Sequence, residues 1–249
     1  MRKLWILVIT GAILGGAALL EIYASVLYPV TEYEPGGLPQ LAVGVERDYD
    51  FFKDGERVGS YSFLVEEMGQ YRDQTAYFTR SLTSVTDHDT VIELETLYIF
   101  NEDLNPLEYR LNATLGEDRQ FIICLFDGWN VNATMEMEDR TVPAELELPA
   151  GTVLIDNNML CQWELFFKSF DPVPGKRVRF TAFVPQILDK KTVELFVEKG
   201  RETLTLNVTA YECMVVRAPD LDIVFYLHDG DLLKLEEPEQ DIEIVVASG

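Results

Sequence analysis

Residues 119–138 read Arg-Gln-Phe-Ile-Ile-Cys-Leu-Phe-Asp-Gly-Trp-Asn-Val-Asn-Ala-Thr-Met-Glu-Met-Glu, and the pattern of this stretch decides the fold. Asp127-Gly128 lies between two apolar-rich runs, which is typical of a two-residue β-hairpin turn. After the turn, apolar and polar residues alternate from Val131 to Glu138, so one face of the strand is buried and the other is wet. The stretch therefore predicts an antiparallel pair of strands, 119–126 with 129–138.

The same pattern recurs along the chain. Asp54-Gly55, Lys199-Gly200 and Asp229-Gly230 also separate strand-like runs. They predict three more hairpins, 45–53 with 56–67, 191–198 with 201–217, and 221–228 with 231–246. Further strands are expected at 74–85, 90–100, 141–148 and 176–184, and residues 109–115 and 203–209 alternate clearly. We therefore expect a mainly β protein, built on a curved antiparallel sheet that forms a half-barrel or an open barrel.

One segment, residues 156–170, has helical rather than strand periodicity. Its apolar residues at helical spacing are Met159, Leu160, Trp163, Phe166, Phe167 and Phe170. Asp156 or Asn157 is suited to cap the start, and Asp171-Pro172 ends the segment. We expect the sheet to be packed around this one helix. A cavity between helix and sheet would make Trp163, Phe166 and Phe167 the candidate ligand-binding residues.

Residues 1–30 predict a membrane helix. Arg2 and Lys3 precede an uncharged run, Leu4–Leu20, and Tyr23 and Tyr28 stand where an interfacial aromatic belt would lie. We expect a single-pass anchor through residues 4–30, with the domain outside the cell membrane. The alternative is a cleaved signal peptide, after which the domain would be secreted. Residues 31–43 are rich in Pro and Gly and predict a linker, which leaves residues 44–247 for the half-barrel domain.

The composition limits the partners. The formal net charge is −23, so the surface repels phosphate backbones, and we expect no nucleic acid partner. The same charge repels anionic lipid headgroups, which leaves the N-terminal segment as the expected contact with the membrane. One disulfide among Cys124, Cys161 and Cys213 is possible in an oxidising compartment, and the sequence does not choose among the three pairings. The three N-x-[ST] sequons, at Asn112, Asn132 and Asn207, are possible glycosylation sites on the polar face of their strands.

The catalytic motifs that can be recognised from sequence are missing. The chain has two histidines, His88 and His228, and lacks H-E-x-x-H, G-x-S-x-G, C-x-x-C and Walker-type patterns. We therefore expect no metal, no cofactor and no enzyme activity. The alternative is a secreted hydrolase that uses two carboxylates, which would need two acids converging in a cleft.

Two stretches resemble secreted half-barrel β-proteins of unknown function, which are similar in architecture to bacterial lipoprotein carriers. Phe52-Lys-Asp-Gly-Glu-Arg-Val-Gly59 looks like the hairpin that opens many such proteins. Tyr211–Val216 followed by Val224–Glu236 looks like their closing strands. The resemblance implies the fold rather than an activity. Together with the absence of catalytic motifs, it leads us to expect a tethered, extracytoplasmic domain that binds an apolar ligand, such as a lipid, or an envelope protein partner.

Overall fold

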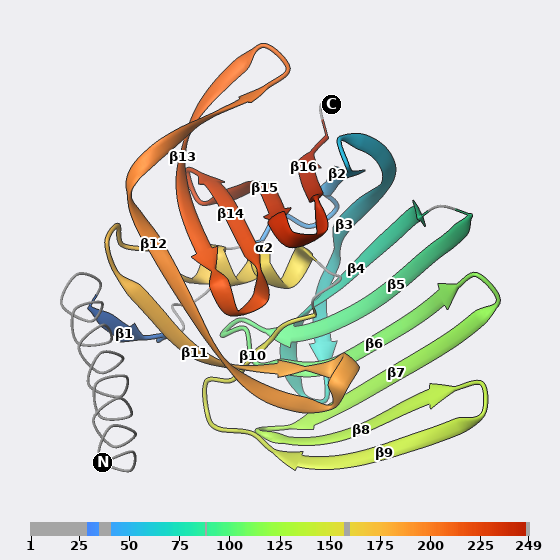
Figure 1. The fold of residues 1–249 in the computed structure, drawn as a ribbon. Helices are drawn as coiled ribbons and strands as arrows, with labels where there is room; N and C mark the ends of the chain where they lie inside the picture. Colours follow the sequence, from blue (N-terminus) through green and yellow to red (C-terminus); the bar gives the residue numbers. More distant parts are fainter. Residues whose placement is uncertain (1–28, 35–40, 88, 157–159, 248–249) are drawn as a thin grey trace, which may run out of the picture.

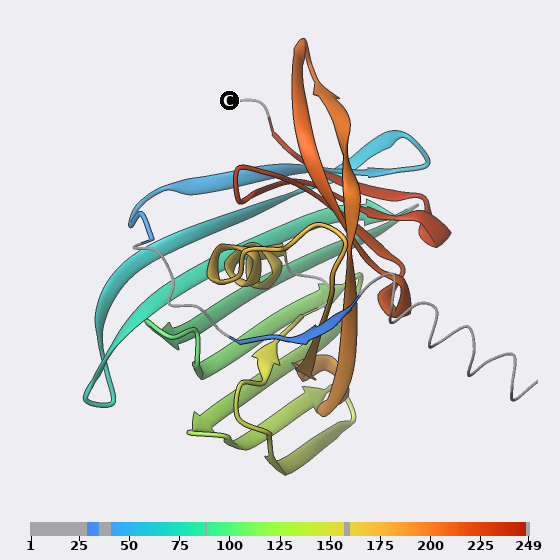
Figure 2. The same ribbon diagram turned by 90° about the vertical axis from the view of Figure 1, so that its left-hand side faces the viewer.

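The computed structural model describes residues 29–34, 41–87, 89–156 and 160–247, and these form one open, strongly curved sheet around a helix (Figures 1 and 2). The sheet order is β1-β11-β12-β13-β14-β15-β16-β2-β3-β4-β5-β6-β7-β8-β9, with β10 pairing beside β11. Neighbouring strands are antiparallel, except that β1 and β10 pair with β11 in parallel. The expected curved antiparallel sheet is therefore confirmed, and its two edges, β1 and β9, do not pair with each other.

The strands of the first half of the chain are β1 Val30–Glu32, β2 Glu46–Lys53, β3 Glu56–Tyr71, β4 Gln74–Asp87, β5 Thr90–Asn101, β6 Pro106–Leu115, β7 Asp118–Asp127, β8 Asn130–Met137 and β9 Arg140–Glu147. Those of the second half are β10 Val153–Leu154, β11 Arg177–Val184, β12 Asp189–Leu206, β13 Thr209–Ala218, β14 Ile223–His228, β15 Asp231–Glu237 and β16 Ile242–Val246. The described helix is α2, Leu160–Ser169.

Two of the three Asp-Gly turns lie where the sequence places them, with β2 pairing with β3 around Asp54-Gly55 and β14 with β15 around Asp229-Gly230. The third turn is one residue later than expected, at Gly128-Trp129, because Asp127 is still in β7 and pairs with Asn130 of β8. At Asp54-Gly55 both residues have positive φ, of 51° and 75°, which is the geometry of a type I′ hairpin turn. The strands predicted at 74–85, 90–100, 141–148 and 176–184 are also present, as β4, β5, β9 and β11.

The turn predicted at Lys199-Gly200 is wrong. β12 continues through these residues with a register shift between Val197 and Arg201, and the chain turns instead at Asn207-Val208. An irregularity of this kind inserts residues into one strand without ending it, so a glycine there can resemble a turn in sequence. The resulting long hairpin, β12–β13, projects beyond the rest of the sheet (Figures 1 and 2). For this reason Leu204 and Leu206 are only half-buried, and Val208 at the tip is 97 % exposed.

A second strand prediction is wrong in its length. The run 231–246 is two strands, β15 and β16, separated by a short 3₁₀ turn at Pro238–Gln240. Similar turns at Pro185–Ile187 and Pro219–Leu221 connect β11 to β12 and β13 to β14. Each of the three turns begins with a proline. The first residue after each turn, Leu188, Asp222 or Asp241, has positive φ, so the chain reverses within a few residues.

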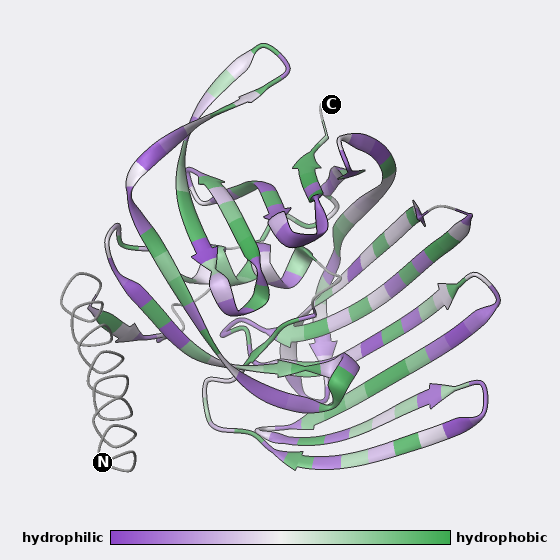
Figure 3. Cartoon of the chain, viewed as in Figure 1, coloured by the Kyte–Doolittle hydropathy of each residue, from purple (hydrophilic) through white to green (hydrophobic). Residues whose placement is uncertain are grey.

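The buried face is the concave one. Polar and apolar residues alternate along β6 to β9 in Figure 3, and in β8 the buried residues are Val131, Ala133 and Met135. Asn132 and Glu136 of the same strand are exposed. The concave residues of most strands join the core that surrounds α2.

The boundaries of the helix differ from the expected 156–170. α2 begins at Leu160 in the described residues, and Asn157 and Met159 lie outside them. The Asp156 carboxylate accepts hydrogen bonds from Tyr109 Oη and Gln186 Nε2, and its expected role as a helix cap stays a prediction. Phe170 follows the helix and is only half-buried. The helix itself is buried on nearly every side, which is why its polar residues Gln162 and Glu164 are buried as well.

The segment expected to be a linker contributes to the fold. Val30–Glu32 form β1, and Tyr33 packs on Phe166 with ring centroids 4.8 Å apart. Tyr33 Oη and Ser169 Oγ are 2.9 Å apart, which ties this segment to the end of α2. Residues 31–33 of the expected linker are therefore part of the sheet and its core contacts, because the exposed edge of β11 has free N–H and C=O groups with which three residues can pair.

Residues 1–28, the greater part of the predicted membrane segment, lie outside the described residues. None of the helices that the structure describes has both the length and the apolar character needed to cross a bilayer.

Candidate functional site

The three candidate ligand-binding residues lie in the packed core. Trp163, Phe166 and Phe167 are 1 %, 1 % and 3 % exposed. The Trp163 ring is 4.7 Å from Phe225 of β14 and 6.1 Å from Phe166, measured between ring centroids. Aromatic rings therefore fill the space around Trp163, between α2 and the sheet, where a cavity would have made these three residues ligand-binding.

Charged residues hold the polar side of α2 against the sheet. Arg47 of β2 donates hydrogen bonds to Glu164 of α2 and to Asp231, the latter at 2.7 Å. Lys168 Nζ is 2.6 Å from the same Asp231 oxygen. Burial raises the pKa of Glu164, although Arg47 and Lys168 oppose the shift. Burial alone would also raise the pKa of Asp231, but its hydrogen bonds with Lys168 and Arg47 lower it overall. We interpret this cluster as an anchor for the helix.

A surface hollow of about 600 Å³ lies beside the end of α2. Of the three candidate ligand-binding residues, Trp163, Phe166 and Phe167, it is Phe167 that lines this hollow. Its lining is mixed, because the charged Lys168, Asp171, Arg201 and Asp229 stand beside the apolar Phe170, Pro172, Met214 and Leu227. The charged side chains are well solvated. An apolar ligand would have to strip water from them. The hollow is therefore a poor match for the predicted ligand.

A different hollow, at the opposite end of the sheet, has apolar walls. We call it the mouth hollow; its volume is about 400 Å³, and it lies inside the curve formed by the consecutive strands β14, β15, β16, β2, β3, β4 and β5. Nine of its fourteen lining residues are apolar: Phe51, Val58, Val85, Ile92, Leu94, Leu221, Ile223, Ile242 and Ile244. The polar ones are Lys53, Thr83, Asp87, Glu237 and Gln240. A concave apolar surface with a few polar groups is the usual form of a small-molecule site.

The local sequence explains why this hollow is open. Ile242 and Ile244 alternate with outward residues along β16, as Ile92 and Leu94 do along β5, so each strand presents two inward apolar side chains. Gly59 of β3 lies opposite Val85, and a Cβ there would be 2.2 Å from the Ser84 carbonyl oxygen. Glycine therefore lets β3 and β4 approach closely and adds no side chain to the space.

The inner end of the mouth hollow is closed by a layer of hydroxyl-bearing residues. Ser81 and Thr96, each 1 % exposed, are hydrogen-bonded to each other, and Ser81 Oγ is 3.9 Å from Cys161 Sγ of α2. Tyr61 Oη accepts a hydrogen bond of 2.8 Å from the Cys161 backbone N–H. These residues do not line the hollow themselves; Ser81 and Thr96 are the next inward residues behind its lining residues Thr83 and Leu94, and we call this layer, with the start of α2, the floor.

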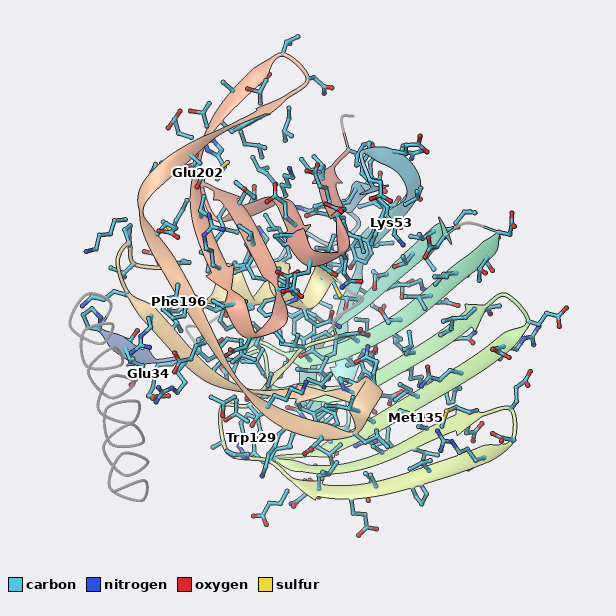
Figure 4. The ribbon with its side chains drawn as sticks, in the orientation of Figure 1. Glu34, Lys53, Trp129, Met135, Phe196 and Glu202 are labelled. Carbon is cyan, nitrogen blue, oxygen red and sulfur yellow. The ribbon has the colours of Figure 1, made fainter. Side chains whose placement is uncertain are left out.

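The outer rim carries the charges. Lys53, labelled in Figure 4, is 3.0 Å from Asp87, and both side chains are about one-third exposed. Burial raises the pKa of Glu237, and the nearby Asp222 adds to the shift. Asp222 also accepts a hydrogen bond of 2.6 Å from the Glu239 backbone N–H, so its position is explained by the 3₁₀ turn. The hydrolase alternative requires two neighbouring acids, and near this hollow Glu237 and Asp222 are the pair that comes nearest to that arrangement.

The other sequence-based candidates are dispersed. Cys124, Cys161 and Cys213 are free and buried, so the possible disulfide is not formed. Burial raises the pKa of the Cys124 and Cys161 thiols to about 12, which makes them poor nucleophiles. In the described part of the chain, no three His, Cys, Asp or Glu side chains gather as a metal site would require. His88 lies outside that part, and His228 accompanies Asp229 near the β14–β15 turn.

The sequons are exposed. Asn112 and Asn132 lie on the outer face of β6 and β8, as expected, and glycosylation there stays a prediction. Asn207 lies in the β12–β13 turn with φ of 54°, not on a strand face.

Sequence reasoning missed the mouth hollow. Its lining comes from seven strands and two turns that are far apart in the chain. In the sequence, these lining residues show only as apolar residues on the inward face of strands, next to turns. Residues of an ordinary packed core show the same pattern, so the sequence does not distinguish the two.

The fold and the hollow define an open, β-barrel-like domain with an internal helix. No protein-family model matches the chain. No curated protein matches it either. Among solved structures, it is similar to a β-barrel-like protein of the domain of unknown function DUF1849 from Brucella abortus, with 10 % identity, a TM-score of 0.48, and coverage of 82 % of this chain and 95 % of that one.

Two further structures are similar. One is a DUF1089 family protein from Pseudomonas aeruginosa, with 11 % identity, a TM-score of 0.39, and coverage of 81 % of this chain and 94 % of that one. The other is a putative exported protein with a YmcC-like fold from Bacteroides fragilis, with 8 % identity, a TM-score of 0.32, and coverage of 86 % and 98 %. These descriptions agree with the expected resemblance to β-proteins of unknown function, and they name no activity.

Proposed function

We propose that the domain binds an apolar small molecule non-covalently in the mouth hollow. The observation that carries the proposal is the chemistry of the walls, which are nine apolar side chains around about 400 Å³. Pockets for small ligands begin at about 300 Å³ and are lined mainly by hydrophobic residues. Lys53 and Asp87 lie at the rim, where they would orient the polar end of a ligand.

Photoreactive alkyl probes test this proposal in the full-length chain, because cross-linked peptides report where a probe binds. We expect cross-links in β4, β5 and β16. Ile92→Trp places a large ring in the hollow and should reduce these cross-links at least tenfold. Val91→Trp is the matched control, because Val91 precedes Ile92 on β5, does not line the hollow and is 46 % exposed. Cross-links that are absent from these strands, or equal in both variants, would contradict the proposal.

We also propose that the domain works outside the cell membrane, held by residues 4–30 or released by their cleavage. Arg2, Lys3 and the uncharged run Leu4–Leu20 support this orientation. Labelling of intact cells with a membrane-impermeant amine reagent tests it, since Lys190 and Lys191 are exposed. Labelling that occurs only after lysis would contradict it.

A further inference from the structure

The mouth hollow has a measurable depth. Along β4 its lining residues are Thr83, Val85 and Asp87, which are alternate residues of one strand and so share a face. Asp87 belongs to the rim and Thr83 lies deepest. The next inward residue, Ser81, is already covered by Cys161 of α2. At about 3.3 Å per residue, the four steps from Asp87 to Thr83 span about 13 Å.

The other strands give the same limit. On β5 the hollow is lined by Ile92 and Leu94, which pair with Val85 and Thr83, and the next inward residue, Thr96, is bonded to Ser81. On β2 the next inward residue after Phe51 is Tyr49, which is 1 % exposed and donates a hydrogen bond to the Leu232 carbonyl oxygen. The hollow therefore ends at one depth on several strands, because α2 occupies the space beyond.

A membrane acyl chain is longer than this. The hydrocarbon core of a bilayer is about 30 Å thick, so a chain in one leaflet spans about 15 Å. The volume of about 400 Å³ also lies near the lower end for ligand pockets, which favours one chain over two. The floor is made of hydroxyl groups and a helix that are hydrogen-bonded to each other, and an apolar chain cannot replace those bonds.

We propose that α2 and the hydroxyl layer act as a length gauge, so that the mouth hollow takes a single alkyl chain shorter than those of membrane lipids. The chain lies along β4 with its polar end beside Lys53 and Asp87. This inference rests on the proposed function and adds the ligand class. Each methylene that enters the hollow should improve binding about fourfold, and methylenes beyond the floor should add nothing.

The test is a competition series with one uncharged head group. Alkyl maltosides from octyl to hexadecyl compete with a decyl photoprobe for cross-linking to β4 and β5, with the full-length chain held in an amphipathic polymer. We expect competition to strengthen up to decyl or dodecyl and then to level off. Continued strengthening to hexadecyl would overturn the length gauge. Absence of any cross-link to these strands would instead overturn the proposed function.

Variants at Thr83, the lining residue in front of the floor, give an independent readout. The levelling point is the chain length beyond which competition no longer strengthens. Thr83→Phe fills the deepest part of the hollow and should move the levelling point to a shorter chain, and Thr83→Met should move it less. Leu82→Phe is the control, because Leu82 is the neighbouring residue on the outer face and is 48 % exposed. A levelling point that stays the same in folded Thr83→Phe or Thr83→Met protein would overturn the gauge.

Discussion

Arg47 of β2 and Glu164 of α2 form an ion pair across the concave side of the sheet, and the Glu164 side chain is only 1 % exposed. A buried carboxylate that loses its partner is strongly destabilising. We expect Arg47→Met to lower the free energy of unfolding by about 3 kcal/mol, at the low end of that range because Arg47 is 30 % exposed and Lys168 is near.

The measurement is the denaturant midpoint at constant m-value. Arg57→Met is the control, because the Arg57–Asp50 pair is more exposed and should cost less than about 1 kcal/mol. Adding Glu164→Gln to Arg47→Met should recover part of the loss, since it removes the unpaired charge. Equal midpoints for the two arginine variants would show that the pair does not hold the helix.

Trp163 should be essential to the packing of α2. Its ring is buried against Phe225 and Phe167, with centroids 4.7 Å and 6.3 Å away. Trp163→Ala leaves a large cavity and should cost about 3 kcal/mol or more in the free energy of unfolding. Trp129→Ala is the comparison, because Trp129 is only half-buried and should cost less. A Trp163→Ala midpoint near that of the parent would refute the packing described above.

Gly59 should not tolerate a side chain. A Cβ there would lie 2.2 Å from the Ser84 carbonyl oxygen and 2.7 Å from Val85 Cα, and backbone atoms of a paired strand cannot move aside cheaply. We expect Gly59→Ala to cost about 1–3 kcal/mol through overpacking. Gly69→Ala, on the same strand with its nearest contact at 3.5 Å, should be nearly neutral by comparison. Thermal unfolding of the two variants checks the difference.

Glu237 should make the stability depend on pH. Its pKa in the folded domain is raised by burial and by Asp222, whereas in the unfolded chain it is about 4.3. Between these two values the folded state binds more protons, so stability falls as pH rises from the unfolded to the folded pKa. Glu237→Gln should flatten this part of the curve and stabilise the domain at neutral pH.

The control for this charge change is Glu239→Gln, since Glu239 is exposed. We expect its pH dependence in that window to match the parent. Denaturant midpoints between pH 4 and pH 7 measure the effect. If the stability of the parent, relative to that of Glu237→Gln, rises with pH across this window, the predicted sign is wrong. The Glu237→Gln variant also tests the hydrolase alternative, because a catalytic carboxylate at this position would lose its activity when replaced by an amide.

The sequence by itself determined the strands and most of their turns. The turns at Asp54-Gly55, Gly128-Trp129 and Asp229-Gly230 act locally, since their backbone twist matches that of the flanking strands. The alternation in β8 likewise identifies the buried face without any tertiary information. The same local reasoning failed at Lys199-Gly200, where pairing with β13 keeps β12 extended through the irregularity.

Tertiary structure decided which apolar faces are filled and which are open. Trp163 and Ile244 are both inward apolar residues, yet one is covered by Phe225 and the other lines the mouth hollow. The difference depends on where α2 lies inside the curve of the sheet. A ten-residue helix covers only part of that curve, so the hollow forms where the helix does not reach. Because its walls come from strands remote in sequence, periodicity shows that these residues face inward, and packing alone determines what they contact.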